Sequence, residues 1–241
     1  SWYWMPDIFE NFFKRFDKNP SEYYDLIKLD PGFKIVFENS EMILPANWNE
    51  ICDLFDHYEE NGADKLNKFM DDAEKKYSIG LRFLYNSPGL SITELLKKDV
   101  LLNANKLQLL TSYRKHIKRH FKNNRLISLL EFPVLFLGTS AESAPALYSL
   151  MSYSGIKQGT FYPMGGFAKV IESMAEICKN NGVKFLLEEQ VTKINIFNNT
   201  VKSVTTNTQE LPANFVVGAA DYVHIESKLI DKKYQNYNSN Y

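Results

Sequence analysis

The chain has 241 residues, of which 44% are hydrophobic, with 28 basic and 29 acidic side chains and a formal net charge of -1. This length and apolar content suffice for one large packed domain or two small ones, and they exclude extensive disorder. The balanced charge excludes a global field that would attract nucleic acid, so no nucleic-acid partner is expected. Cys52 and Cys178 have neither metal-ligand spacing nor a redox Cys-x-x-Cys pattern. Two reduced thiols in a cytoplasmic protein without a metal site are expected.

Neither a signal peptide nor a membrane span is expected. The first residues, Ser1 to Asp7, lack the positively charged region of a signal peptide, and no apolar stretch follows them. The most apolar tract, 126–138, is interrupted by Glu131 and Pro133, and it is shorter than the roughly 20 residues needed to cross a bilayer.

The first 155 residues show mainly helical periodicity. A hairpin is predicted from the alternation in 33–37 and 42–44, and capping patterns begin at Asn47 and Ser91. We therefore expect residues 1–155 to form a mainly helical region with a small β-hairpin. The helices are expected at 7–16, 22–28, 48–60, 63–85, a short segment from 91, 103–122, 125–137 and 143–153.

After Gly155 the pattern changes to alternating strands and helices, so residues 156–231 are expected to form an α/β unit with an added β-meander. Asn198-Asn199 has the composition of a hairpin turn. The tail, 232–241, lacks periodicity and is expected to fray. The fold class is thus α/β, or α+β when the helical region is included. The expected elements are strands at 160–162, 183–187, 191–197, 201–206 and 214–217, and helices at 167–180 and 222–229.

Four segments of the chain are distinctive in combination: Ser1-Trp-Tyr-Trp-Met-Pro-Asp7, Phe136-Leu-Gly-Thr-Ser140, Ala144-Pro-Ala-Leu-Tyr-Ser-Leu-Met151 and Phe161-Tyr-Pro-Met-Gly-Gly166. Together they resemble the bacterial-type phytoene desaturases, a family of flavin-dependent carotenoid oxidoreductases.

Two further elements are less specific. One runs from Gly165-Gly166 through an expected helix and strand to Glu189-Gln190-Val191, and the other is Val216 to Asp221. Both resemble the wider superfamily of flavin amine-oxidase-like proteins. The chain departs from the family because it has no Gly-x-Gly-x-x-Gly, the turn that receives a dinucleotide pyrophosphate. The resemblance therefore implies that this chain is the central part of such an enzyme. It would contain part of a Rossmann-like FAD-binding domain, and its partners would be the N- and C-terminal parts of the same enzyme.

The resemblance implies FAD as the cofactor and assigns four residues to it. The backbone of Val191 would pair with the adenine ring, and Ala219, Ala220 and Asp221 would pass the flavin. From the residues alone, Val191 is equally well explained as a core residue and Asp221 as the N-cap of helix 222–229, a role compatible with the first. Gly165 and Gly166 suit either tight packing or contact with a phosphate.

The implied reaction removes hydrogens from a carbon–carbon single bond of a phytoene-like polyene and extends its conjugation. The cofactor supplies the difficult chemistry, so few titratable catalytic residues are expected, with Asp221 and Arg114 as the candidates near the flavin or the channel mouth. By the same resemblance, Tyr162 and Tyr148 are expected to line the substrate pocket.

A basic amphipathic helix is predicted around Tyr113 to Lys122. Such a helix suits an anionic membrane surface, although a solvated helix face paired to acids explains it as well. His116 and His120 lack a third ligand in register, so no metal is expected there. Because carotenoid precursors dissolve in lipid, we expect a cytoplasmic enzyme that is peripherally associated with the membrane. The alternatives are a related carotenoid or retinoid isomerase or saturase, and a non-catalytic lipid-binding or membrane-binding helical module.

Overall fold

The computed structural model describes residues 2–86 and 107–236, and the chain divides into two compact units, 1–177 and 178–241. The division lies beyond position 155, where we expected the helical region to end. Residues 156–177 belong to the first unit for two reasons. Strand β4 (Phe161–Pro163) pairs with β1 (Leu26–Lys28), and helix α8 (Phe167–Asn180) packs against helix α1 (Pro6–Lys14) in a shared apolar core.

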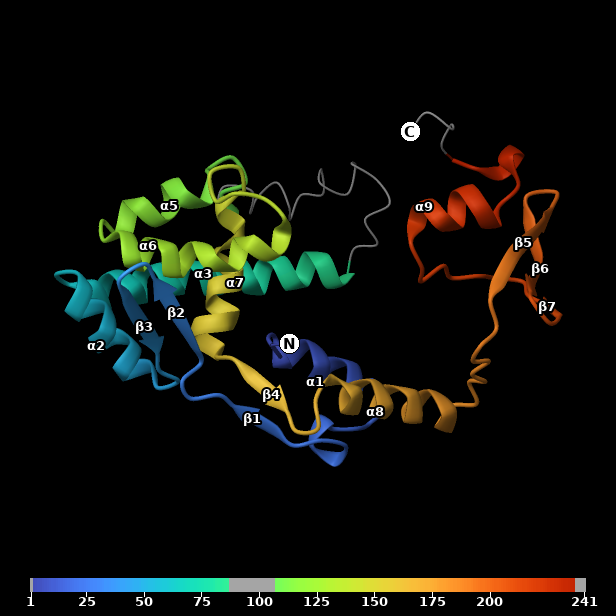
Figure 1. Cartoon of the computed structure of the whole chain (residues 1–241), viewed down its shortest axis with the longest axis horizontal. Coiled ribbons are helices and arrows are strands. Elements are labelled where there is room, and N and C mark those ends of the chain that lie inside the picture. The colour runs from blue at the N-terminus through green and yellow to red at the C-terminus, as the bar shows by residue number, and fades with distance from the viewer. Residues whose placement is uncertain (1, 87–106, 237–241) are drawn as a thin grey trace. The chain divides into compact units, whose positions relative to one another are not determined.

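Unit 1 is mainly helical and contains two short antiparallel strand pairs: the β2–β3 hairpin, and the pair of β1 with β4, which lies far from β1 in the sequence. Figure 1 shows α3 running alongside α5 and α6, with the β2–β3 hairpin near α2. Its α-helices and strands in chain order are α1 (Pro6–Lys14), β1 (Leu26–Lys28), β2 (Phe33–Phe37), β3 (Ser40–Leu44), α2 (Trp48–Tyr58), α3 (Gly62–Asn86), α5 (Tyr113–His120), α6 (Asn124–Glu131), α7 (Ser149–Ser152), β4 (Phe161–Pro163) and α8 (Phe167–Asn180), whose last residues lie in unit 2. The other turns of helix are η1 (Pro20–Glu22), η3 (Phe132–Leu137), η4 (Ala146–Tyr148) and the π-helix η5 (Tyr153–Gln158).

Side-chain caps explain where several of these helices begin. Asn47 accepts hydrogen bonds from two amides of the first turn of α2, as its capping pattern predicts. Ser112 and Asn123 cap α5 and α6 in the same way. The sequence therefore determines these starts locally, before any tertiary contact is made.

Two buried clusters hold unit 1 together. The larger cluster joins α2, α3, α5, α6 and the β2–β3 hairpin around the fully buried rings of Phe55, Phe69 and Tyr113. The smaller cluster joins α1 to α8 through Tyr3, Phe13 and other apolar side chains. Burial of apolar surface contributes roughly 25 cal/mol per Å², so these two clusters supply the main stabilising term of the unit.

Several expected elements of unit 1 are different in the structure. The helix expected at 22–28 is wrong: Leu26–Lys28 is a strand, because it pairs antiparallel with Phe161–Pro163 far along the chain. The helix expected at 125–137 stops at Glu131 and continues as the 3₁₀ turn η3, since Pro133 cannot donate an α-helical hydrogen bond. The helix expected at 103–122 is interrupted within the described residues: Leu107 is helical, 108–110 form a turn, and α5 begins at Tyr113. The short helix expected from Ser91 lies outside the described residues. The segment 143–153 forms η4 and α7 and runs into η5.

Unit 2 contains a three-stranded antiparallel sheet in the order β5–β6–β7. Asn198 and Asn199 both have positive φ angles in the β5–β6 turn, which confirms the expected hairpin. Its elements are β5 (Val191–Phe197), β6 (Thr200–Thr206), β7 (Glu210–Pro212), α9 (Tyr222–His224), the π-helix η6 (Ile225–Leu229) and the 3₁₀ turn η7 (Lys232–Tyr234).

The strands expected at 183–187 and 214–217 are wrong for this structure, which assigns neither segment to a strand. Their apolar side chains are exposed instead, reaching 80% at both Leu187 and Phe215. Apolar strands of this kind need neighbours on a sheet, and no described strand pairs with them. Together the two units have the mixed helix and sheet content of the expected class. Within the described residues, no helix is both long enough and apolar enough to cross a bilayer.

Candidate functional site at the meeting point of the motif segments

The motif segments that lie far apart in the sequence meet in unit 1. Tyr3 and Phe161 exchange two backbone hydrogen bonds of 3.1 Å, which joins the first segment to the fourth. The Met5 amide donates to Ser154 Oγ at 3.1 Å, and the indole Nε1 of Trp4 donates to Thr160 Oγ1 at 2.9 Å. The segment Ala144–Met151 runs directly into η5, which carries Ser154. The combination that predicted the family is thus one contiguous region of the molecule.

Four aromatic side chains form a cluster at this meeting point, which we call the aromatic cluster: Trp2, Trp4, Phe132 and Phe136. The two indoles are stacked with their ring centroids 5.8 Å apart and an interplanar angle of 14°. Phe136 meets both indoles edge-on, at 5.1 Å from Trp2 and 5.7 Å from Trp4. These are favourable aromatic geometries. The first and second motif segments therefore contact each other through their rings.

Alternation along the N-terminal segment places Tyr3 away from the aromatic cluster. Side chains of an extended segment alternate in direction, and Tyr3 stacks on Phe9 in the smaller buried core. Its hydroxyl forms a hydrogen bond of 2.8 Å with that of Tyr24. Burial raises the pKa of both hydroxyls, so they remain protonated. Tyr3 thus anchors the segment whose other face presents Trp2 and Trp4.

The two tyrosines expected to line a substrate pocket lie on different parts of unit 1. Tyr162 is on β4 opposite Ile27, and both side chains are exposed. Tyr148 ends η4 and packs partly buried against the larger core. Their role toward a substrate stays a prediction.

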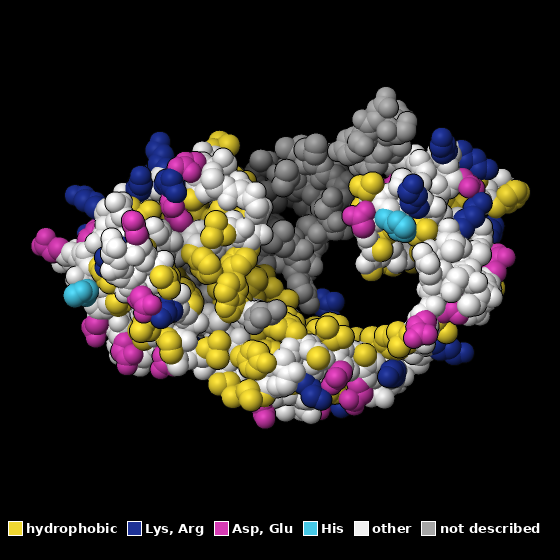
Figure 2. Space-filling view, viewed as in Figure 1, with side chains coloured by type: hydrophobic (Ala, Val, Ile, Leu, Met, Phe, Trp, Pro, Cys, Tyr) yellow, Lys and Arg dark blue, Asp and Glu magenta, His cyan; other side chains and the backbone are white. Residues whose placement is uncertain are grey.

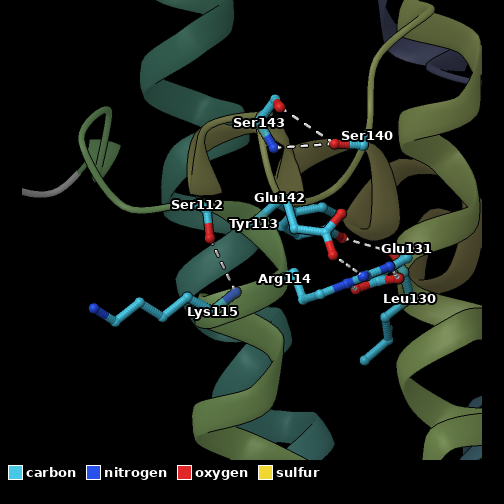
Figure 3. A network of polar contacts seen from close by, with 9 residues as sticks. All are labelled: Ser112, Tyr113, Arg114, Lys115, Leu130, Glu131, Ser140, Glu142 and Ser143. Carbon is cyan, nitrogen blue, oxygen red and sulfur yellow. Dashed lines mark hydrogen bonds and ion pairs between the residues drawn. The ribbon is translucent and has the colours of Figure 1, made fainter.

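Arg114 lies in an ion-pair network between α5 and α6 (Figure 3). Its guanidinium donates to both oxygens of Glu131, at 2.5 and 2.6 Å, and also to Glu142. The Glu131 carboxylate raises the pKa of Arg114, which stays charged. The network gives Arg114 a clear role in holding α5 to α6, and its catalytic role stays a prediction.

A buried polar cluster between α3 and α5 was not anticipated from the sequence. Lys76 is fully buried, and its Nζ donates to Asp72 Oδ2 at 2.6 Å and lies 3.4 Å from His116 Nε2. Burial alone would raise the pKa of Asp72, but hydrogen bonds from His116 and Lys76 hold it at about 2. Burial lowers the pKa of Lys76. The i, i+4 spacing of Asp72 and Lys76 was the one available sequence signal, and it does not reveal burial.

A cleft of about 790 Å³ lies along α3 beside this polar cluster. Its charged lining makes it unsuited to a neutral hydrocarbon. The lining consists of Asp71, Asp72, Glu74, Lys75, Ser78, Ile79 and Gln108. Among the described residues, no group of three potential ligands could hold a metal ion, and His116 lies beside His120 without a third one.

The four residues expected at the cofactor lie in unit 2. Val191 begins β5 opposite Thr206, and Asp221 accepts a hydrogen bond from the amide of His224, so the N-cap interpretation of Asp221 is confirmed. Ala219 and Ala220 are exposed and small, so a planar group could approach their backbone closely. The exposure of Ala219 and Ala220 is compatible with a flavin site, and the roles of all four residues toward the cofactor stay predictions.

The chain belongs to the family of flavin containing amine oxidoreductases, whose sequence pattern matches residues 12–236. This confirms the membership that the motifs predicted, and FAD is the cofactor that the family implies.

Curated relatives narrow the similarity to carotenoid desaturases. The chain is 30% identical over 249 residues to the carotenoid 3,4-desaturase of Haloarcula japonica, covering 100% of this chain and 49% of that protein. It is 26% identical to the phytoene desaturase of Fusarium fujikuroi, covering 95% of this chain and 41% of the relative. It is 24% identical to a 4,4'-diapophytoene desaturase of Staphylococcus aureus, covering 79% and 38%. The chain thus spans about half the length of these relatives or less.

Proposed function

We propose that this chain is part of an FAD-dependent carotenoid desaturase, which removes hydrogens from carbon–carbon single bonds of a phytoene-like polyene. The observation that carries the proposal is that the motif segments meet at one aromatic junction, in a chain whose named relatives act as carotenoid, phytoene or diapophytoene desaturases. An uncharged aromatic surface suits a hydrocarbon substrate that has no polar group to bind.

Bound FAD would supply the acceptor for the hydride that leaves an allylic carbon, and the neighbouring carbon would lose a proton to a basic group at the site, which completes the double bond. The part of this chain is to orient the polyene and exclude water, because the developing allylic cation is stabilised by its own conjugation. Val191, Ala219, Ala220 and Asp221 are the residues we propose to hold the cofactor. Asp221 and Arg114 remain the proposed positions near the flavin or the channel mouth, and Tyr162 and Tyr148 are proposed to contact the substrate.

Expression of the full-length enzyme with a colourless carotene precursor tests this function. We expect a product that absorbs in the visible and has lost pairs of hydrogens by mass spectrometry. A product of unchanged mass would indicate an isomerase, and a gain of hydrogens would indicate a saturase. Purified protein without bound flavin and without product would favour a non-catalytic lipid-binding module.

We also propose that the exposed apolar segments 183–187 and 214–217 pair with strands from other parts of the same enzyme. The support is their strand-like composition combined with the exposure of Leu187 and Phe215. Hydrogen exchange compares the longer protein with this chain, and slower exchange of both segments in the longer protein is expected. Equal exchange in both proteins would contradict the pairing.

Peripheral attachment to the cytoplasmic face of a membrane is a further part of the proposed function. The apolar side of α5 is not available for insertion, since Ile117 and Phe121 are buried in the core. The solvent side of this region carries exposed basic residues, and Leu110 immediately before it is fully exposed. The basic residues are Lys115, Lys118, Arg119 and Lys122. Attraction to anionic lipid at about 1 kcal/mol per basic residue would then dominate.

Vesicle sedimentation tests this attachment. The double variant Lys118→Glu/Arg119→Glu should lose binding to phosphatidylserine vesicles, and salt should weaken wild-type binding. A matched control is Lys202→Glu/Lys228→Glu in unit 2, which changes the charge equally. Equal losses in both variants would contradict a role for α5.

A further inference from the structure

We propose that the aromatic cluster is a binding surface for the polyene chain of the substrate, with the rings of Trp2 and Phe136 in direct contact with it. The inference rests on the proposed function, which supplies the class of ligand, a neutral conjugated hydrocarbon. It assigns a substrate contact to residues other than Tyr162 and Tyr148.

The first argument is that the cluster is held rigidly from behind. The indole of Trp4 is fixed by its hydrogen bond to the buried Thr160, whose own hydroxyl donates to the Gly155 carbonyl at 3.3 Å. The same indole lies on Gly155, where an added Cβ would approach Trp4 Cζ2 to 2.7 Å. The indole of Trp4 is therefore held in place by buried contacts. Because Trp2 stacks on this indole, the position of Trp2 is restricted as well.

The second argument is that the front of the cluster is open. Trp2 is 45% exposed and Phe136 is 49% exposed, although each ring is in contact with other rings of the cluster. Leu135 beside them is 70% exposed. Figure 2 shows hydrophobic side chains gathered on this face of unit 1 around α7 and α1. A contiguous group of large, solvent-exposed apolar side chains is typical of a binding surface, whereas single exposed apolar residues are not.

The third argument is the charge of the surface. The two backbone segments that build it, 2–6 and 132–140, contain no charged residue. The cleft on α3, by contrast, is lined by carboxylates and a lysine. The neutral surface is electrostatically matched to a neutral hydrocarbon, and the charged cleft is not.

The fourth argument is shape. A conjugated polyene is flat and polarizable, and it can lie along stacked indole edges and a perpendicular phenyl ring through the contacts that aromatic pairs make with one another. Trp2 and Phe136 present such a pair, with an interplanar angle of 72°. Rigid aromatic residues bind at low entropic cost because few torsions must be ordered.

Binding of lycopene in neutral detergent micelles to the full-length enzyme tests the proposal without requiring turnover. The variants Trp2→Ala and Phe136→Ala are each expected to weaken binding about tenfold, since removal of one central aromatic contact typically has an effect of this size. The matched control is Phe197→Ala on β5, because Phe197 is 64% exposed and lies outside the cluster. This control should bind lycopene within about twofold of wild type.

Conservative variants separate a binding role from a folding role. Trp2→Phe keeps a ring and should restore most of the affinity, and all variants should keep the wild-type circular dichroism spectrum and flavin content. In the desaturation assay, Phe136→Ala should raise KM more than it lowers kcat, because the contact is made equally before and during reaction.

Three results would overturn the proposal. One is wild-type affinity in Phe136→Ala and Trp2→Ala, and another is failure of the wild-type enzyme to bind lycopene. The third is loss of binding to phosphatidylcholine vesicles in these variants with lycopene binding unchanged, which would make the cluster a membrane contact. If the enzyme binds lycopene through the cluster but forms no desaturated product, the proposed function fails and this inference stands.

Discussion

Unit 1 and unit 2 differ in how much of their apolar sequence they bury. In unit 1 the rings of Phe55, Phe69 and Tyr113 are fully buried in a core that joins helices to a hairpin. In unit 2 the sheet has three strands. Two further segments, 183–187 and 214–217, have the composition of buried strands, but their side chains Leu187 and Phe215 are exposed. The difference shows that unit 1 completes its core with elements that all lie within residues 1–177, whereas the strand-like segments of unit 2 find no partner strand among the described residues.

The largest expected contrast between the units is in the cost of removing a ring. Phe69→Ala should destabilise unit 1 by about 3 to 5 kcal/mol, because a buried phenyl ring leaves a cavity. Urea unfolding followed by tryptophan fluorescence measures this, since all three tryptophans, Trp2, Trp4 and Trp48, lie in unit 1. Phe215→Ala in unit 2 should change stability by less than about 0.5 kcal/mol by circular dichroism. Comparable losses in the two variants would mean that Phe215 is buried in solution.

The second contrast concerns stability at low pH. Unit 1 should become less stable when Asp72 is protonated. Its pKa is held at about 2, below the ordinary 3.8, so its stabilising contribution is complete above about pH 4 and disappears as the pH falls toward 2. The shift corresponds to roughly 2 kcal/mol. Urea unfolding at several pH values between 6 and 2 measures this. The free energy of unfolding should fall more steeply with decreasing pH for wild type than for Asp72→Asn.

Lys76→Met serves as the control for that measurement. Asp72→Asn leaves a buried ammonium without its carboxylate, whereas Lys76→Met removes the need for the carboxylate and keeps the volume. We expect Lys76→Met to lose less stability at neutral pH than Asp72→Asn. The opposite order would show that the pair itself, and not the desolvated lysine, dominates the energetics.

A third contrast comes from two glycines, one in each unit. Gly155→Ala should cost about 1 to 2 kcal/mol, because the new methyl group meets the fixed indole of Trp4 at 2.7 Å. Gly218→Ala meets only the flexible end of Ile225, which can rotate away, so a change below about 0.5 kcal/mol is expected. Urea unfolding measures both, and a shifted tryptophan emission should accompany Gly155→Ala alone. An unchanged emission spectrum would argue against a rigidly held Trp4 indole.

The smallest contrast is between two ion pairs. Arg114→Met should cost about 1 kcal/mol, since it breaks bidentate contacts to a largely buried Glu131. Lys193→Met in unit 2 should cost less than about 0.5 kcal/mol, because its pair with Asp231 is nearly half exposed. Melting temperatures at low and high salt check both values.

The same substitution tests the catalytic proposal for Arg114. Glu131→Gln breaks the same network from the other side and serves as the control. If only Arg114→Met loses desaturase activity at equal stability, Arg114 acts on the reaction. Equal loss in both variants would limit Arg114 to its structural role.

Features that depend on local physical chemistry could be predicted from the sequence. The cap at Asn47, the paired asparagines at 198 and 199, and the helical period of α3 and α8 act within a few residues of where they lie. The cap at Ser112 is equally local, but the helical period on both sides of it concealed the break before α5. The motif residues were also sufficient to indicate the flavin oxidoreductase family.

Features that depend on contacts between distant residues could not be predicted from local sequence. Leu26–Lys28 became a strand because Phe161–Pro163 lies beside it, and Lys76 became a buried charge because α5 covers it. The aromatic cluster joins Trp2 to Phe136 across more than half of the chain. Segments 183–187 and 214–217 have the composition of strands, but they form none here because a strand needs backbone partners that local sequence cannot provide.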